Sequence, residues 1–132
     1  MADHEESFQA SVLLVCLGNI CRSPTAEGVL RKLLADAGLG GRVRVDSAGT
    51  AGYHVGAAPD PRATAAAQAR GFDLSPLRAR RVATEDFERF DLILAMDEDN
   101  LADLQRSAPE GARARLGLLL DYAPGQERRT VP

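Results

Sequence analysis

The chain has 132 residues, of which 45% are apolar, and carries a formal net charge of −3. This length predicts a single domain, residues 1–132, with one core. The lack of an apolar run of about 18 residues and of a signal-peptide pattern predicts a soluble cytoplasmic protein, and the acidic balance argues against nucleic-acid or membrane partners.

Apolar runs that suit buried strands alternate with segments of helical spacing. The predicted strands are 11–15, 43–45, 91–96 and 115–120. The predicted helices are 24–37, 61–71, a short one after Thr84, and 97–107. The side chains predicted to cap these helices are Ser23, Asp60, Thr84 and Asp97. The alternation predicts an α/β protein with an open parallel sheet flanked by helices.

The segments between these helices and strands have fewer sequence features that predict a structure. Residues 1–10 are predicted to be a loose lead-in, 72–82 irregular, and 121–125 a turn. Residues 47–52 are predicted to be a flexible loop leading to Tyr53 and His54. Because the first two strands end on the same side of a parallel sheet, these two side chains are expected near Cys16. Spacing alone favours an ordinary loop tyrosine over a functional one, although an aromatic ring there could stack on an aryl phosphate.

The segment from Cys16 to Arg22 has the chemistry of an oxyanion site. It joins a strand to a helix whose start is marked by Ser23 and Pro24, so free N–H groups and the positive end of the helix dipole face inward. The same field should stabilise a thiolate nucleophile at Cys16. Arg22 offers two coplanar donors to phosphate oxygens, and Gly18 permits a tight turn.

Two other interpretations of these residues are weaker. A buried strand-end cysteine and a solvated arginine are each common, but their combination at this spacing favours a site. A zinc centre is not supported, because Cys16 and Cys21 lack a second ligand pair and His4 and His54 lack metal-ligand spacing. We therefore expect no metal and no cofactor. The two cysteines are too few for a disulfide framework, which is typical of a reducing compartment.

Residues 16–24, CLGNICRSP, resemble the phosphate-binding loop of the low-molecular-weight protein tyrosine phosphatases. The resemblance extends to residues 45–56, 60–62 and 94–100, in the family's order. It implies a four-stranded parallel sheet in a three-layer, flavodoxin-like topology. It also implies a phosphatase that hydrolyses phosphotyrosine monoesters in protein substrates through a phosphocysteine, and that binds phosphate or other oxyanions.

The resemblance also assigns roles to individual residues. It makes Cys16 the nucleophile and Arg22 the group that binds phosphate and the transition state. It implies a reversible Cys16–Cys21 disulfide that protects the nucleophile, a pairing that the short loop also permits. The residues expected to surround the phosphate are Leu17, Gly18, Asn19, Ile20, Cys21 and Arg22. Loop support is expected from Asn19, Ser23 and Ser47, and a substrate cleft from Ile20 and Tyr53.

Two features of the sequence depart from the family's pattern, one at its C-terminal end and one at Leu77. After residues 130–132 the family continues with an Asp-Pro pair, whose aspartate is the general acid, and with a last helix. The 132-residue chain is therefore expected to be C-terminally short, without that helix, and impaired toward poor leaving groups. Leu77 stands where many members have a histidine that supports the loop, so loop support is expected to be thinner.

Three alternative functions deserve comparison. Family members that act on phosphoarginine have threonine where Ile20 stands, and the bulkier apolar residue better suits an aryl ester. Thiol-dependent arsenate reductases use further downstream cysteines, and none follows Cys21. The third alternative is a non-catalytic module that binds phosphate or phosphotyrosine.

Overall fold

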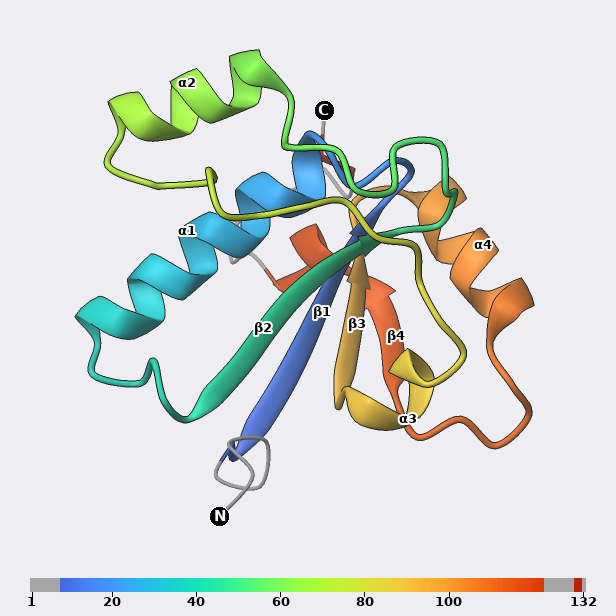
Figure 1. The fold of residues 1–132 in the computed structure, drawn as a ribbon. Coiled ribbons are helices and arrows are strands. Elements are labelled where there is room, and N and C mark those ends of the chain that lie inside the picture. The colour runs from blue at the N-terminus through green and yellow to red at the C-terminus, as the bar shows by residue number, and fades with distance from the viewer. Residues whose placement is uncertain (1–7, 123–129, 132) are drawn as a thin grey trace.

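The computed structural model describes residues 8–122 and 130–131. Its centre is a sheet of four parallel strands in the order β2-β1-β3-β4 (Figure 1). The strands are β1 (Ala10–Cys16), β2 (Val43–Gly49), β3 (Leu92–Ala95) and β4 (Arg115–Leu118). This confirms the predicted α/β class and its flavodoxin-like strand order. The chain changes direction across the sheet between β1 and β3, and ligands of such folds bind at the carboxyl end of that switch point.

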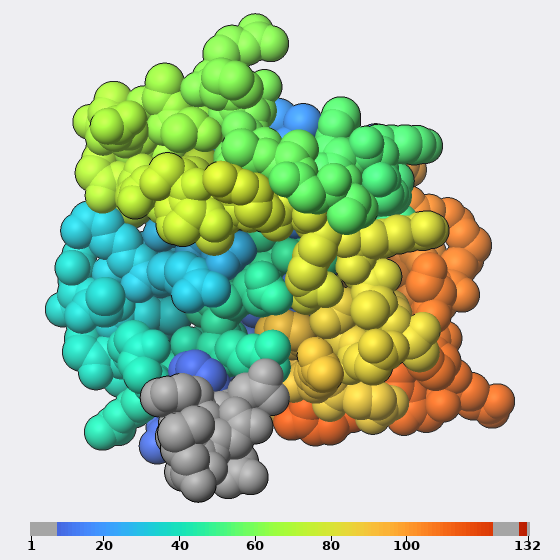
Figure 2. Space-filling view, viewed as in Figure 1, coloured from blue at the N-terminus to red at the C-terminus, as the bar shows by residue number. Residues whose placement is uncertain are grey.

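Helices lie on both faces of the sheet. They are α1 (Arg22–Asp36), α2 (Pro61–Ala69), α3 (Asp86–Arg89) and α4 (Glu98–Ser107), with a 3-10 helix η2 (Leu119–Tyr122) after β4. Helix α1 packs against β1 and β2 on one face, and α3 and α4 lie on the other. Helix α2 and the segment before it lie beyond the carboxyl ends of the strands (Figures 1 and 2).

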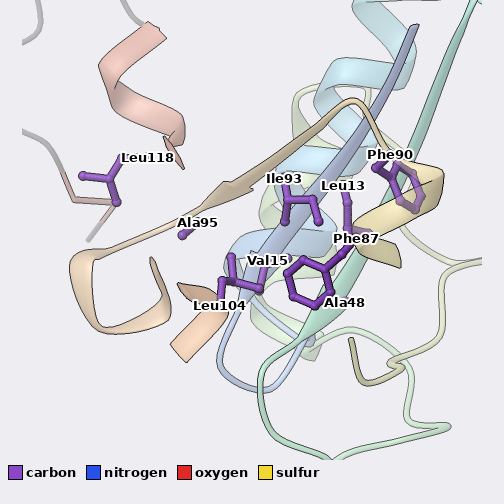
Figure 3. Close-up of a cluster of buried hydrophobic side chains, with 9 residues drawn as sticks. All are labelled: Leu13, Val15, Ala48, Phe87, Phe90, Ile93, Ala95, Leu104 and Leu118. Atoms are coloured by element: carbon purple, nitrogen blue, oxygen red, sulfur yellow. The ribbon is translucent and has the colours of Figure 1, made fainter. Parts of the chain in front are cut away.

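The alternating side chains of β1 build two apolar layers. Leu13 and Val15 face α3 and α4, whereas Leu14 and Cys16 face α1. The first layer consists of Leu13, Val15, Ala48, Phe87, Phe90, Ile93, Ala95, Leu104 and Leu118 (Figure 3). Because its strand is buried on both faces, Cys16 is held on a rigid support at the end of β1.

The lengths of β2 and β4 differ from the prediction. Residues 47–49 do not begin a flexible loop; they continue β2 and pair with β1 as far as Cys16 opposite Gly49. The absence of a side chain at Gly49 permits this pairing, since a Cβ there would lie 2.6 Å from the carbonyl oxygen of Leu17. At the other edge, residues 119–120 leave β4 and enter η2.

Two of the four predicted helix caps are wrong. Helix α1 begins at Arg22, so Ser23 lies inside its first turn, and the residue at the cap position, Cys21, makes no capping bond with its side chain. Thr84 does not cap α3, which begins at Asp86. Ser23 Oγ instead contacts Cys16 and Asn19, and at the start of α3 the carboxylate of Asp86 accepts from the backbone N–H of Ala83.

The caps of the two other helices are confirmed. Asp60 accepts a hydrogen bond from the backbone of Ala63 at the start of α2, and Asp97 does the same for Asn100 in α4. Residues 1–7 of the predicted lead-in and 123–125 of the predicted turn lie outside the described residues. Within residues 8–122 and 130–131, no helix combines the length and apolar character needed to span a lipid bilayer.

Candidate active site

The loop of residues 17–21 connects β1 to α1 at the carboxyl edge of the sheet, beside the switch point. Asn19 has a φ of 58°, a left-handed conformation that few residues other than glycine adopt. Its side chain is buried and fully engaged in hydrogen bonds, which hold this conformation. The loop is therefore a fixed structural feature.

The thiol of Cys16 lies at the base of this loop. Its residue is 4% exposed, and its Sγ is 3.0 Å from the Oγ of Ser23. The backbone N–H of Asn19 donates to the same Sγ at 3.3 Å. A hydroxyl and an amide can thus donate to a negatively charged sulfur at this position. Ser23, which was expected to support the loop, therefore contacts the Cys16 sulfur.

The backbone of the loop supplies a set of open donors. In the described part of the chain, no acceptor pairs with the N–H groups of Leu17, Gly18, Ile20, Cys21 and Arg22. These groups lie at the start of α1, where the helix dipole is positive. Open amides that precede a helix make a concave site for an oxyanion.

Asn19 joins the loop to its surroundings through three hydrogen bonds. Its Nδ2 donates to the Oγ of Ser23 at 2.8 Å and to the Oγ of Ser47 at 2.9 Å. Its Oδ1 accepts from the backbone N–H of Arg80 at 3.0 Å. The three residues predicted to support the loop therefore lie together. Arg80 joins them through its backbone, a contact that no local sequence pattern predicts.

A buried carboxylate extends this network. Ser47 Oγ donates to Oε1 of Glu27 at 2.6 Å, and Arg31 Nε donates to Oε2 at 2.7 Å. Glu27 is 2% exposed and was not predicted as a site residue. The sequence did contain a signal for Glu27, because this charged residue stands at helical spacing among the apolar residues of α1. Leu77 is half-buried and takes no part in these hydrogen bonds.

Arg22 is anchored at the first residue of α1. Its Nη1 forms an ion pair with Oδ2 of Asp97 at 2.9 Å and donates to the carbonyl of Val131 at 2.9 Å. Its Nη2 donates to Oδ1 of Asn100 at 3.4 Å. Asp97, predicted only as a helix cap, therefore caps α4 and also holds Arg22. This contact joins the first residue of α1 to the cap of α4.

A cavity of about 180 Å³ opens over the loop. It is lined by Cys16, Leu17, Gly18, Ile20, Cys21, Arg22, Tyr53 and His54. The expectation that Tyr53 and His54 lie near the loop is confirmed. The His54 ring packs so closely on Gly18 that a Cβ there would lie 2.9 Å from it.

Cys16 and Cys21 are both free thiols, the first buried and the second exposed. Partial desolvation and, to a lesser degree, the nearby carboxylate of Asp60 raise the pKa of the Cys21 thiol. Cys21 is therefore a neutral thiol over a wider pH range than an ordinary cysteine.

These features define a class of protein: a parallel α/β fold with a rigid oxyanion-binding loop, a cysteine at its base and an anchored arginine at its end. Comparison with known proteins gives a family with this kind of site. A family model described as low molecular weight phosphotyrosine protein phosphatase matches residues 11–132. The chain belongs to this family.

Individual relatives support the assignment. The human low molecular weight phosphotyrosine protein phosphatase is 46% identical over 124 residues, or 92% of this chain and 78% of the relative. A crystal structure of a protein tyrosine phosphatase from Entamoeba histolytica has a TM-score of 0.88 and 37% identity, covering 94% of this chain and 79% of that one. The structure of DARP, a Drosophila arginine phosphatase, has a TM-score of 0.79 and 35% identity over 84% of this chain and 71% of that one.

Proposed function

We propose that this chain hydrolyses phosphotyrosine monoesters through a phosphocysteine at Cys16. The observation that carries the proposal is the position of the Cys16 sulfur in a cavity bordered by open loop amides and by Arg22. An aryl phosphate placed there has its phosphorus next to the sulfur and its oxygens next to the donors. Tyr53, which is 78% exposed at the rim, offers its ring to the aryl group.

The reaction has two displacement steps. The Cys16 thiolate attacks phosphorus, so that an S–P bond forms as the P–O bond to the phenol breaks, and the departing phenoxide takes up a proton. Water then attacks the phosphocysteine, an O–P bond forms, and the S–P bond breaks to return the thiolate and release phosphate. The loop amides and Arg22 stabilise the charge on the equatorial oxygens in both steps.

The contacts of Arg22 leave the correct donors for this role. Val131 accepts a hydrogen bond from Nη1, Asn100 accepts one from Nη2, and Asp97 forms an ion pair with Nη1. In the described part of the chain, Nε has no acceptor, and the edge formed by Nε and Nη2 can present two donors to a ligand. That edge binds two phosphate oxygens together, which a lysine ammonium group does not do.

Two substitutions test the mechanism. Cys16→Ser should abolish turnover of phosphotyrosine peptides but retain vanadate binding, whereas Arg22→Lys should weaken both by about tenfold or more. Acid-quenched intact mass should show one phosphoryl group on the parent protein and none on Cys16→Ser. A parent that binds vanadate without ever carrying that group would be a phosphate-binding module, contrary to the proposal.

The second candidate is a protein arginine phosphatase, and the similarity to DARP favours it. The side chain of Ile20 argues for the aryl ester, because it places a bulky apolar group in the cavity wall beside Tyr53. Turnover of matched peptides with phosphotyrosine or phosphoarginine at the same position distinguishes the two. A higher kcat/KM for the phosphoarginine peptide would reject phosphotyrosine as the preferred substrate.

The proposed cellular compartment follows from the chemistry of the catalytic thiol. A catalytic cysteine and a second free thiol in one loop need a reducing compartment, which we infer to be the cytoplasm. The proposed substrates are phosphoproteins, and inorganic phosphate is a product that competes for the same loop.

A further inference from the structure

A second cavity, of about 250 Å³, lies on the face of the sheet opposite α1. It is bounded by the end of β2, the segment leading into α3, and α4 (Figure 1). Its lining residues are Thr50, Arg81, Val82, Ala83, Thr84, Phe87, Leu104 and Ser107. None of these residues lines the cavity over the phosphate loop. The proposed phosphatase mechanism makes no use of it.

The polar residues of this cavity favour an anion. Its lining contains one guanidinium group, from Arg81, and the hydroxyl groups of Thr50, Thr84 and Ser107, but no carboxylate. In the described part of the chain, the Arg81 side chain has no hydrogen bond or ion pair. Arg81 and Thr84 are exposed, so a ligand can reach the charge from solvent.

The lining also includes two buried apolar side chains and one unsatisfied polar atom. Phe87 and Leu104, both 1% exposed, belong to the apolar layer that faces α3 and α4 (Figure 3). The Oγ1 atom of Thr50 is buried and has no hydrogen-bond partner in the described structure. A buried hydroxyl without a partner loses free energy, and a bound group that pairs with it recovers that loss.

We propose that this cavity binds a small organic carboxylate with a compact apolar body. The carboxylate accepts from the Arg81 guanidinium and from the hydroxyl groups of Thr50 and Thr84. The apolar body lies against Phe87 and Leu104. One planar guanidinium group matches one carboxylate, and the cavity volume suits a ligand the size of benzoate.

The cavity is joined to the phosphate loop by short backbone contacts. The N–H of Thr50 donates to the carbonyl of Cys16 at 2.9 Å, and the N–H of Val82 donates to the carbonyl of Gly49 at 2.8 Å. The neighbour of Arg81, Arg80, donates its N–H to Asn19. A carboxylate that bridges Thr50 and Arg81 therefore fixes two segments that support the loop. Binding at the two sites should be mutually favourable.

The first experiment titrates benzoate into the protein and follows backbone amide signals by NMR. The signals of Thr50, Val82 and Ser107 should shift together and saturate, with acetate and benzamide binding at least tenfold more weakly. Arg81→Gln should weaken benzoate binding at least tenfold, whereas Arg78→Gln, an exposed arginine outside the cavity, should not. Equal binding of benzamide and benzoate, or shifts confined to residues 17–22, would overturn the proposal.

The second experiment uses Thr50→Val, which removes the hydroxyl group and keeps the side-chain shape. Because that hydroxyl is unpaired, the variant should melt at the same or a higher temperature and bind benzoate several-fold more weakly. A lower melting temperature with unchanged benzoate affinity would mean that the hydroxyl serves the fold, and would refute the site.

The third experiment measures vanadate affinity with and without saturating benzoate. Benzoate should tighten vanadate binding in the parent but not in Arg81→Gln. Unchanged or weaker vanadate binding in the parent would overturn the coupling between the two sites. The NMR titration detects the carboxylate site even if the phosphatase mechanism is wrong, so the two proposals fail separately.

Discussion

Gly49 shows how closely the sheet supports the phosphate loop. A Cβ at this position would lie 2.6 Å from the carbonyl of Leu17, 3.0 Å from that of Ala51 and 3.1 Å from the carbonyl carbon of Gly18. All three neighbours are backbone atoms, which have no rotamer with which to move aside. The last residue of β2 therefore fixes the position of the loop relative to Cys16.

We expect Gly49→Ala to lower kcat/KM on aryl phosphates by about tenfold to 100-fold, because the loop must shift by a fraction of an ångström or more. The matched control is Gly41→Ala, where no atom lies within 4 Å of the added Cβ. Steady-state kinetics on both variants test this. Activity of Gly49→Ala equal to that of the control would show that the loop adjusts freely.

A second prediction for a single residue concerns Cys21, which we expect to act as a resolving thiol. After peroxide converts the proposed nucleophile Cys16 to a sulfenic acid, the Cys21 thiolate attacks its sulfur, so that an S–S bond forms as the S–O bond breaks, and the hydroxide that leaves takes up a proton from solvent. Because the pKa of Cys21 is raised, little thiolate is present at neutral pH and its fraction grows as pH rises through and beyond the ordinary cysteine range. Disulfide formation should therefore accelerate with pH over that interval.

Stopped-flow measurement of thiol loss as a function of pH tests this rate. In addition, the parent should recover more activity than Cys21→Ser when peroxide treatment is followed by dithiothreitol. Equal recovery in the two proteins would contradict a protective role for Cys21.

At the scale of elements, Arg80 holds the segment before α3 against the sheet. Its guanidinium group binds Asp46 of β2 at 3.0 Å and Asp86 of α3 at 2.9 Å. Burial lowers the pKa of Arg80, but the hydrogen bonds and charges of these two carboxylates outweigh it and raise the pKa overall. The side chain therefore stays charged, and its backbone N–H can bond to Asn19.

Replacing Arg80 with glutamine should lower the free energy of unfolding by about 2 kcal/mol, since it leaves the buried carboxylate of Asp86 without its cation. Urea unfolding measures this effect. In a double-mutant cycle, Asp86→Asn should reduce the loss, while Arg78→Gln, at an exposed arginine, serves as the control. Additive effects of the two changes would rule out the ion pair as the cause.

At the scale of the whole molecule, the loop and the two apolar layers form one cooperative structure. Strand β1 carries Leu13 and Val15 into one layer and Leu14 and Cys16 into the other, so unfolding either layer disrupts the site. A ligand that binds only the folded loop must therefore stabilise the entire chain.

Phosphate at 100 times its Kd should raise the free energy of unfolding by about 2.7 kcal/mol in the parent, and by much less at the same concentration in Arg22→Lys. Leu104→Ala provides the control, because it lies in the apolar layer away from the loop. It should lower stability by about 2–4 kcal/mol yet keep the same increment with phosphate. Thermal or urea unfolding with and without phosphate measures both values, and an increment retained in Arg22→Lys would contradict the assigned anion site.

The local pattern of the sequence was sufficient for the α/β class and the open parallel sheet, because apolar strands alternate with helices and parallel crossovers have a fixed hand. The strand order followed from the family resemblance. The local pattern also located the oxyanion loop, since Cys16, Gly18 and Arg22 are neighbours in the chain. It was wrong about Ser23 and Thr84 as caps and about residues 47–49 as a loop. Capping and turn preferences are weak local energies, and the hydrogen bonds of Ser23 and the pairing of residues 47–49 with β1 outweigh them at those positions.

Only the tertiary structure decided which distant groups complete the loop. Ser47 was named from the family resemblance, but Glu27, the backbone of Arg80 and the second role of Asp97 were found only in the folded chain. The cavity around Thr50 likewise exists only after β2, α3 and α4 have packed. The physical reason is that adjacent residues determine a loop's chemistry, whereas its rigidity depends on hydrogen bonds between segments that only folding brings together.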